Sequence, residues 1–515
     1  MARVEIDLSA PDLFGNDAAE DEEESVFQAY AVDRDETRNF SDPARRVCIV
    51  RAYKGEGKSA LLRLAATRLI EQHGPSLIII RDSANSLAPN ITSANFGQSV
   101  REWKRAILER VATAVGSRIG IAWSDDAMSL VEEAERQGFK GRSVVSSILD
   151  RLKPKAKFKE AELEVALGKL GTPNPAATVQ RWLRGREPLW VFVDDVDQNF
   201  QNTAASKTTV ASFFVACREM GNVIPELRMR AAVRPNVWTT IKMEFEPLSH
   251  VEQYVTDLSW SESANRTLLA RRVEGYLARN AQLDDLVDRL PTDQPQRERW
   301  LVAQVCQDPM PWGKGGRERP PHVVLHTLSK QRPRWVVELC KVSAARAAKR
   351  DSRIIEKRDV LAELDEFGKR RIQDTVAEFR AQCPEIGELL AAFNREKEEY
   401  ATDELLDLIQ RKILDHAKPR ISGVIATARP LDVAAFLFEV GFFFGRRDYA
   451  DGTYDHITFS DRPSLLRART GVDDGVRWEI HPVFRQALEI RDPYGQETAP
   501  REERLKGGVI RRRPQ

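Results

Sequence analysis

Residues 46–59 read RVCIVRAYKGEGKS, and this stretch decides the fold. Its apolar part, residues 47–50, lies between two arginines, as expected of a short buried strand in a parallel sheet. A glycine loop follows at once, and from residue 59 to residue 72 apolar side chains recur at helical spacing. A second apolar run occupies residues 77–80. The pattern predicts a strand, a loop, a helix and a second strand.

The glycine loop has the residues needed to hold phosphate groups. Backbone N–H groups at a helix N-terminus favour anions, and Gly55 and Gly57 allow the tight turn that brings those groups close. Lys58 is placed to reach the β- and γ-phosphates of ATP, and the Ser59 hydroxyl is placed to bind Mg²⁺. The candidate nucleotide-binding residues in the loop are Lys54, Gly55, Glu56, Gly57, Lys58, Ser59 and Ala60. The alternative is a glycine turn without a ligand, since Ala52 replaces the first glycine of the GxxxxGK[ST] pattern.

A second half of the site is predicted downstream. The apolar run at residues 189–193 ends in Asp194 and Asp195, which is a Walker B arrangement. Asp194 would bind Mg²⁺, and Asp195 stands where many ATPases carry the glutamate that orients or deprotonates the attacking water. Because aspartate is one methylene shorter, slow or partner-gated turnover is expected. The alternative is that Asp195 and Asp197 cap the following helix.

Four arginines are candidates for contact with the terminal phosphate. Arg234 follows the apolar run at residues 229–233, and the carboxyl ends of parallel strands face the ligand crevice, so it is the sensor candidate. The alternative for Arg234 is a surface salt bridge. Arg334 opens a later helix that would form part of a lid and is the second nucleotide-binding candidate. Arg218 and Arg230 are possible arginine fingers across a subunit interface. The catalytic candidates are Lys58, Asp195 and Arg234.

The strands and helices alternate through the first half of the chain, which predicts an α/β fold with a parallel sheet covered on both faces. Later segments are helical, and short aromatic and β-branched runs near the end indicate a winged-helix-like α+β module. The expected organisation is an acidic tail (1–28), a P-loop ATPase core (29–260) with a helical insertion (about 96–184), a helical lid (261–360), a helical connector (361–420), a winged-helix-like domain (421–493) and a basic tail (494–515).

Composition indicates a soluble chain in a reducing compartment. Hydrophobic residues make up 42% and charged residues 30% of the 515 residues, and no run approaches the roughly 18 apolar residues that a membrane span needs. No secretory signal is evident, so the cytoplasm is the expected location. The five cysteines form no CxxC pair and are expected to be buried thiols.

Charge argues against a chain that mainly wraps nucleic acid, because the formal net charge is only +1. The ends differ, however: residues 1–27 contain nine acids, and residues 501–515 contain six bases. These are either solvated tails or an acidic tail that meets a basic surface. His481 is expected to be a satisfied residue at a strand end rather than a metal ligand.

With these residues in view, the chain resembles the bacterial P-loop ATPases of the AAA+/STAND superfamily. The stretches that carry the resemblance are residues 54–62 (KGEGKSALL), 194–195 (DD), 233–238 (VRPNVW), 258–261 (LSWS), 332–334 (RPR, like a sensor-2 segment), 439–442 (EVGF) and 480–484 (IHPVF). The resemblance implies an ATP-driven switch that forms a homo-oligomer, of a type found in bacterial anti-phage defence. Such relatives act with a toxic effector, and since no nuclease, protease or deaminase signature occurs, the effector would be a separate chain.

Three functions are therefore weighed. The first is an ATP-hydrolysing oligomeric switch, and the second is a nucleic-acid-dependent motor or loader, because winged helices often read DNA. Residues 421–493 contain nine arginines and eleven acids, so they lack a basic stripe, although the basic tail keeps this alternative open. The third is a non-hydrolysing nucleotide-sensing scaffold, which the short Asp195 side chain would favour.

Overall fold

The computed structural model describes residues 4–74, 77–87, 95–118, 175–312, 317–449, 454–466 and 475–491. The chain divides into two units, and each is described separately. The sheet unit comprises residues 18–259, and the C-terminal unit comprises residues 1–17 together with 260–515. No helix in the described part of the chain is long and apolar enough to cross a membrane.

The sheet unit is built on five parallel strands in the order β2-β3-β4-β1-β5. The strands are β1 (Val47–Arg51), β2 (Ile79–Ser83), β3 (Leu189–Asp194), β4 (Leu227–Val233) and β5 (Val255–Asp257). Residues 47–50 and 189–193 are buried on both faces, which explains their unbroken apolar sequence. The predicted parallel sheet is confirmed, with the second strand displaced by two residues from its apolar run.

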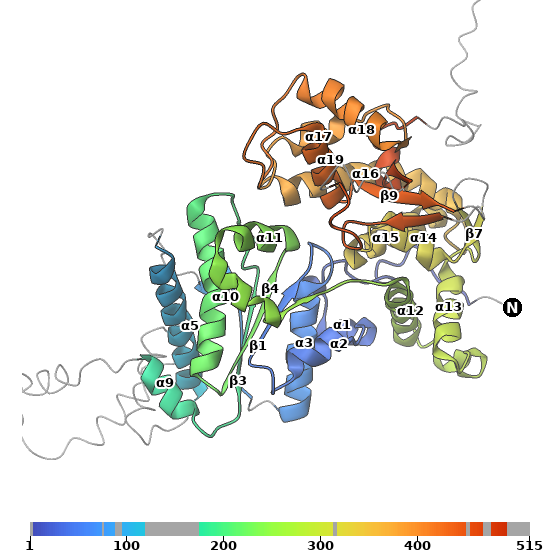
Figure 1. Cartoon of the computed structure of the whole chain (residues 1–515). Helices are drawn as coiled ribbons and strands as arrows, with labels where there is room; N and C mark the ends of the chain where they lie inside the picture. Colours follow the sequence, from blue (N-terminus) through green and yellow to red (C-terminus); the bar gives the residue numbers. More distant parts are fainter. Residues whose placement is uncertain are drawn as a thin grey trace, which may run out of the picture. The chain divides into compact units, whose positions relative to one another are not determined.

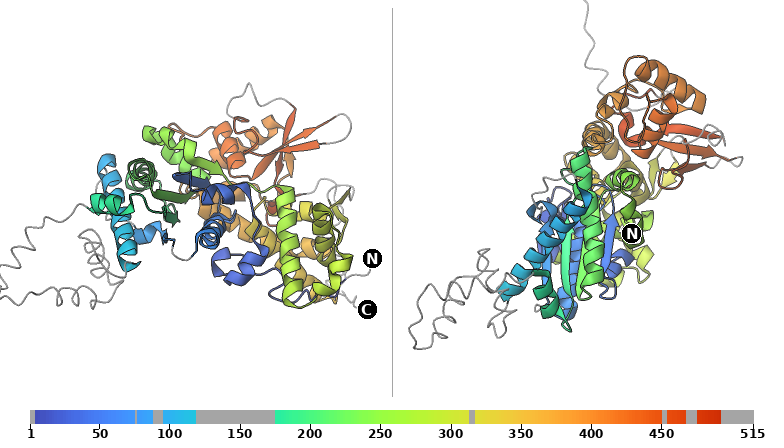
Figure 2. Two further views of the ribbon diagram at one scale, coloured as in Figure 1. Left: turned by 90° about the horizontal axis from the view of Figure 1, so that it is seen from below. Right: turned by 60° about the vertical axis from the view of Figure 1, so that its left-hand side comes forward.

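Helices cover both faces of this sheet (Figure 1). One face packs on α3, which begins at the glycine loop, and the other packs on α5 and α10, which lie side by side (Figure 2). The helices of the unit are α1 (Glu24–Tyr30), α2 (Asp35–Ser41), α3 (Lys58–His73), α4 (Ala84–Leu87), α5 (Phe96–Arg118), α9 (Pro175–Leu183), α10 (Ala204–Val223) and α11 (Pro235–Glu244), with 3₁₀ turns η1 (Ala19–Asp21), η2 (Glu246–His250) and η3 (Glu252–Tyr254). Each core cluster takes alternate residues of the strands, so both sheet faces are buried.

The helical insertion expected at about 96–184 is wrong where the structure describes it. Trp103, Ile107 and Val111 of α5 and Val179 of α9 belong to the main core beside the sheet. These helices therefore form one covering layer of the sheet rather than a separate subdomain, because their apolar faces have the sheet and α10 to pack on. Residues 119–174, the middle of the expected insertion, lie outside the described residues.

Of the two interpretations of the acidic N-terminal segment, residues 1–28, the solvated tail is wrong, because apolar side chains between the acids are buried, and the contact with basic side chains is supported. In the sheet unit, Arg63 on α3 pairs with Glu24 at 2.6 Å and lies over the Phe27 ring. In the C-terminal unit, apolar side chains between the acids are buried, namely Ile6, Leu8, Leu13 and Phe14. Basic side chains of the same unit also bind this segment: Arg279 donates to the Asp12 carbonyl oxygen at 2.8 Å.

The first half of the C-terminal unit is helical, as predicted for a lid. Its elements are α12 (Glu262–Arg279), η4 (Asp284–Arg289), α13 (Gln294–Val305), α14 (Pro321–Leu328), α15 (Pro333–Ala348) and α16 (Lys357–Phe379), and the Pro/Gly stretch holds a small hairpin of β6 (Met310–Trp312) and β7 (Arg317–Arg319). Arg332 and Glu378 form a buried ion pair of 2.8 Å between the start of α15 and α16. Arg332 also stacks on Trp335, so it has a structural role.

A winged-helix-like module completes this unit. Its elements are α17 (Ile386–Ala391), β8 (Glu399–Tyr400), α18 (Thr402–Ile409), the π-helical turn η5 (Gln410–Leu414), α19 (Pro430–Glu439), β9 (Phe443–Asp448), β10 (Tyr454–Ile457), β11 (Val476–Ile480) and α20 (Pro482–Arg485). The antiparallel sheet has the order β10-β9-β11-β8. Because β8 pairs with β11, the module begins before residue 421, and the expected connector at 361–420 contains part of it. The basic tail, 494–515, lies outside the described residues.

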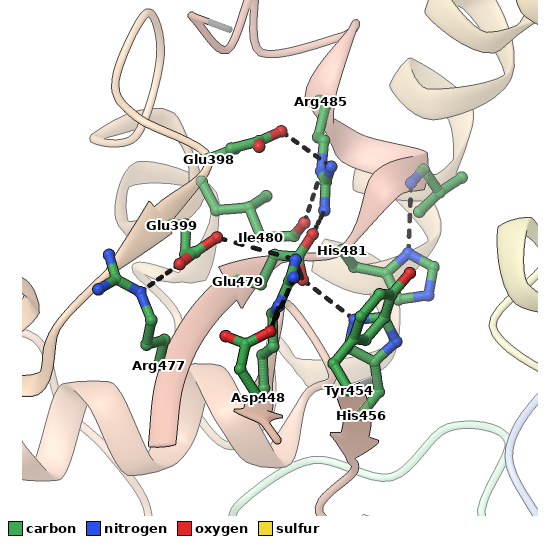
Figure 3. Close-up of polar contacts among 12 residues, drawn as sticks. Glu398, Glu399, Asp448, Tyr454, His456, Arg477, Glu479, Ile480, His481 and Arg485 are labelled. Carbon is green, nitrogen blue, oxygen red and sulfur yellow. Dashed lines mark hydrogen bonds and ion pairs between the residues drawn. The ribbon is translucent and has the colours of Figure 1, made fainter. Parts of the chain in front are cut away.

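One buried carboxylate ties the strands of this module together (Figure 3). Glu479 on β11 accepts a hydrogen bond from His456 Nε2 on β10 at 3.0 Å and pairs with Arg485 on α20 and, at 3.7 Å, with Arg446 on β9. Burial alone would raise the pKa of Glu479, but the hydrogen bond from His456 and the charge of Arg485 outweigh it and lower the pKa to about 2. The next residue, His481, accepts a hydrogen bond from Val483 N and so caps α20, as expected of a satisfied residue at a strand end.

Candidate functional site

The glycine loop joins the end of β1 to the start of α3. Gly55 and Gly57 have φ angles of +84° and +95°, a region that side chains other than glycine rarely adopt, so both glycines are required by the turn. Gly57 is the N-cap of α3, and Lys58 and Ser59 lie in the first helical turn. The backbone N–H groups of a first helical turn have no partners within the helix, so this end of α3 is suited to bind an anion.

Ala52 begins the loop at the position where the common pattern has glycine. Its side chain is buried, and its N–H donates to the Val233 carbonyl oxygen of β4 at 3.1 Å. The loop therefore starts as a continuation of the sheet, and the methyl group of Ala52 fits at this position.

Lys58 lies over the loop that carries it. Its Nζ donates to the carbonyl oxygens of Ala52 at 2.8 Å and Tyr53 at 3.2 Å. The Glu56 carboxylate accepts a hydrogen bond from Tyr53 N at 2.6 Å, which closes the loop on itself. Lys58 is half-buried, as are Ser59 and Ala60, whereas Lys54 is exposed.

At the end of β3 the chain makes a tight turn that carries the acids. Asp194 Oδ1 accepts a hydrogen bond from Asp195 N at 2.8 Å, and Asp195 has a φ of +55°, which aspartate tolerates better than most residues. Burial and the neighbouring Asp194 raise the pKa of Asp195, and the charge of Lys58 opposes that rise. Asp195 is thus a carboxylate with increased basicity that lies within the electrostatic reach of the loop lysine.

The alternative in which Asp195 and Asp197 cap the next helix is wrong. That helix, α10, begins at Ala204, and its N-cap is Thr203, whose hydroxyl accepts a hydrogen bond from Ser206 N. The acids instead belong to a turn that ends well before the helix.

Arg234 meets one of these acids. It follows β4 and is the N-cap of α11, and its backbone N–H donates to Asp197 Oδ2 at 2.5 Å. Its Nε lies 3.7 Å from Asp197 Oδ1. The Asp197 side chain is only 2% exposed, and burial raises its pKa, while Arg234 and then Lys58 oppose the rise. The alternative of a salt bridge for Arg234 is therefore met, although its partner is a buried carboxylate rather than a surface one.

Strand order explains why these residues meet. Strand β4 lies between β1 and β3, so the carboxyl ends of the three strands, with the glycine loop, Arg234 and the acidic turn, are neighbours at one edge of the sheet. Sequence reasoning expected Lys58, Asp194, Asp195 and Arg234 here but missed Asp197 as a member. The only signal for it was a third acid in the DDVD stretch, residues 194–197.

Two further arginine candidates have other contacts. Arg230 is fully buried and donates to the carbonyl oxygens of Phe40, Met229, Asp42 and Arg45, so an arginine-finger role for it is wrong. Arg334 belongs to the C-terminal unit, where its Nε lies 3.5 Å from an Asp17 carboxylate oxygen. All five cysteines are buried free thiols, as predicted.

Comparison with known proteins gives distant structural similarity only. No protein-family model matches the chain, and no curated protein sequence matches it. Among solved structures, the chain is similar to Cdc6p from Pyrobaculum aerophilum at 11% identity, covering 91% of this chain and 98% of that one with a TM-score of 0.29. It is similar to the Aeropyrum pernix ORC2 protein in ADPNP–ADP complexes at 11% identity, covering 90% and 91% with a TM-score of 0.37. Drosophila ORC bound to DNA matches at 11% identity, covering 87% and 90% with a TM-score of 0.29.

With TM-scores below 0.5 these superpositions are loose over their whole length.

Proposed function

We propose that the chain binds ATP with Mg²⁺, hydrolyses it slowly and works as a nucleotide-driven switch. The observation that carries this proposal is the meeting of three features at one sheet edge. These are the glycine loop with Lys58, the acidic turn with Asp194 and Asp195, and Arg234. Together they supply donors for phosphates, oxygen ligands for a hard cation and a carboxylate of raised pKa.

The chain's residues take separate roles in this proposal. The N–H groups at the start of α3 bind the phosphates, and Lys58 adds a point charge. Ser59 and Asp194 are oxygen donors that fit Mg²⁺, which takes few ligands from protein and would neutralise charge on the phosphates when bound. Asp195 orients the attacking water or accepts its proton, and its raised pKa increases its strength as a base. Arg234 senses the terminal phosphate.

Replacing Asp195 by asparagine or alanine is expected to lower the rate of phosphate release by about 100-fold or more, since positioned general bases contribute factors of that order. ATP affinity should change by only a few-fold, because the phosphates are bound by the loop. The rate is measured by phosphate release and the affinity by titration with a non-hydrolysable analogue.

Asp365→Asn is the matched control for this variant, because Asp365 is exposed on α16 and its one ion-pair partner among the described residues is Lys369. Unchanged phosphate release in both Asp195 variants would show that Asp195 is not the acid that positions the water. Tight ATP binding without phosphate release by the unmodified chain would instead favour the non-hydrolysing scaffold.

A second candidate is a nucleic-acid-dependent ATPase, and the corrected extent of the winged-helix-like module favours testing it. The stretch between α18 and α19, residues 410–429, carries five bases (Arg411, Lys412, Lys418, Arg420 and Arg429) and one acid, Asp415. Four of these bases already pair with acids of the same module. The helix that follows, α19, carries Asp432 and Glu439 and no base. This surface suits phosphate contacts better than the reading of base edges.

Phosphate release with and without duplex DNA or RNA, at two salt concentrations, separates the two functions. For the switch we expect the same basal rate in all four conditions. A stimulation that falls as salt rises would establish the nucleic-acid-dependent ATPase instead, because phosphate contacts are salt-dependent.

Assembly into a homo-oligomer, a separate effector chain, a role in anti-phage defence and a cytoplasmic location are proposals that rest on the resemblance and the composition. The first is tested by measuring the mass of the particle with ATP and Mg²⁺. A monomer under every condition would rule out the oligomeric switch.

A further inference from the structure

Asp197 contacts Arg234 at two points. One carboxylate oxygen accepts the backbone N–H of Arg234 at 2.5 Å, and the other lies 3.7 Å from the guanidinium Nε. The first contact fixes the chain where β4 ends and α11 begins, and the second is an ion-pair contact with the guanidinium at the far end of the side chain. Two contacts from one buried carboxylate define the position of this arginine more closely than either contact alone.

Arg234 has little else to hold it. Among the described residues, Asp197 is the one ion-pair or hydrogen-bond partner of its guanidinium. The side chain is 19% exposed, so most of it is buried while part of it reaches solvent. An arginine side chain has about 2 kcal/mol of rotamer entropy, and without Asp197 this freedom would oppose any single orientation.

The Asp197 carboxylate also lies within the charge cluster of the site. Lys58 and Arg234 both lower its pKa against the effect of burial, and Asp197 in turn raises the pKa of Asp195. The turn at residues 194–197 therefore connects Asp194 and Asp195 directly to Arg234. A shift of this turn would move both the expected Mg²⁺ ligand and the partner of the sensor.

We propose that Asp197 is a positioning residue that holds Arg234 for recognition of the terminal phosphate and so gives the site its preference for ATP over ADP. This inference rests on the proposed nucleotide site and assigns a role in it to a residue outside the Walker A and Walker B pair. Asp197 does not touch nucleotide in this proposal. Its effect on the preference for ATP over ADP runs through Arg234.

The experiment measures the dissociation constants of ADP and of a non-hydrolysable ATP analogue for the full chain and four variants. The variants are Asp197→Asn, Arg234→Ala, the double variant and Arg234→Lys. The ratio of the two constants is the readout, because general damage to the site weakens both ligands, whereas loss of a γ-phosphate sensor changes only the triphosphate. Thermal unfolding of each variant reports folding separately.

For Asp197→Asn we expect the ATP-over-ADP ratio to fall about tenfold. This is the effect expected when one charged hydrogen bond, here from Arg234 to the terminal phosphate, is lost. ADP binding should stay the same or become tighter, because a negative charge has been removed near the phosphates. Arg234→Ala should lower the ratio by a similar factor, and the double variant should be no lower than Arg234→Ala. An unchanged ratio in Asp197→Asn, or effects that multiply in the double variant, would overturn the proposal.

Arg234→Lys tests the proposal even if Asp197→Asn fails to fold. Lysine keeps the charge but has no Nε edge for Asp197 to hold, so the ratio should fall as far as in Arg234→Ala. A ratio that lysine preserves would show that charge without positioning is sufficient. If the unmodified chain binds neither ligand, the proposed function itself fails, which is distinct from failure of the Asp197 assignment.

Discussion

The Lys58→Ala variant is expected to lose ATP binding by about 100-fold and phosphate release by a larger factor. Charged hydrogen bonds are worth about 1.5–3 kcal/mol each, and Lys58 supplies the only ammonium in the first turn of α3. The loss should be greater for hydrolysis, because charge develops on the phosphates during transfer. Removal of Lys58 also removes a cation that opposes the raised pKa of Asp195 and of Asp197.

The measurement is a titration with a fluorescent ATP analogue, followed by phosphate release at saturating ATP. Lys242→Ala is the matched control, because Lys242 lies on α11 in the same unit and its exposed side chain pairs with Glu252 at 3.1 Å. We expect that control to bind ATP as the unmodified chain does. ATP binding that survives in Lys58→Ala would remove the glycine loop from the proposed site.

The second large effect is expected on stability. Replacing Glu479 by glutamine should lower the free energy of unfolding of the winged-helix-like module by about 3 kcal/mol. Removing one partner from a buried charge network is destabilising, and here Arg446, Arg485 and His456 lose the carboxylate that they share, although Arg446 keeps Asp448 and Arg485 keeps Glu398. The value agrees with the lowering of the Glu479 pKa from 4.5 to about 2, at about 1.4 kcal/mol per pKa unit.

The folded-state and unfolded-state pKa values of Glu479 also predict how the free energy of unfolding depends on pH. Because the folded-state pKa of Glu479 lies below its unfolded value, its contribution is present above about pH 4.5 and is lost as the pH falls towards 2. The Glu479→Gln variant should therefore lose less stability on acidification than the unmodified chain. Chemical unfolding at pH 7 and pH 3 measures both effects.

Glu489→Gln is the matched control in the same module. Glu489 pairs with Arg395 at 2.6 Å, but both side chains are at least 60% exposed, and such surface pairs contribute about 0–1 kcal/mol. Equal losses in the two variants would contradict the assigned role of burial at Glu479.

The sequence was sufficient to predict the features that depend on neighbouring residues. The apolar strands at 47–50 and 189–193, the glycine loop and the helix after it depend on local spacing, and the structure confirms them. The P-loop residues were predictable for the same reason, since a positive φ at Gly55 and Gly57 is a local property. The roles of the loop residues stay predictions until nucleotide binding is measured.

Features that depend on pairing across long sequence separations were missed. Asp197 and Arg234 meet because β4 lies between β1 and β3, and no local pattern specifies that strand order. Strand β8 has two residues, too few for a period to be visible, so the start of the winged-helix-like module was placed too late. The N-terminal segment was interpreted as a tail because its acids outnumber the few apolar residues that are buried.

The pairing of residues 4–17 with residues after 260 has a consequence for synthesis on the ribosome. The segment is made before the helices that hold it, and those helices include α12, whose Arg272 donates to the carbonyl oxygens of Phe14 and Asn16. The whole sheet unit is translated in between, which takes roughly 10 to 50 s at about 5–20 residues per second. Ile6, Leu8, Leu13 and Phe14 therefore lack their final packing partners after residue 260 throughout that interval. The C-terminal unit therefore cannot complete its core during translation until the first residues of the chain return to it.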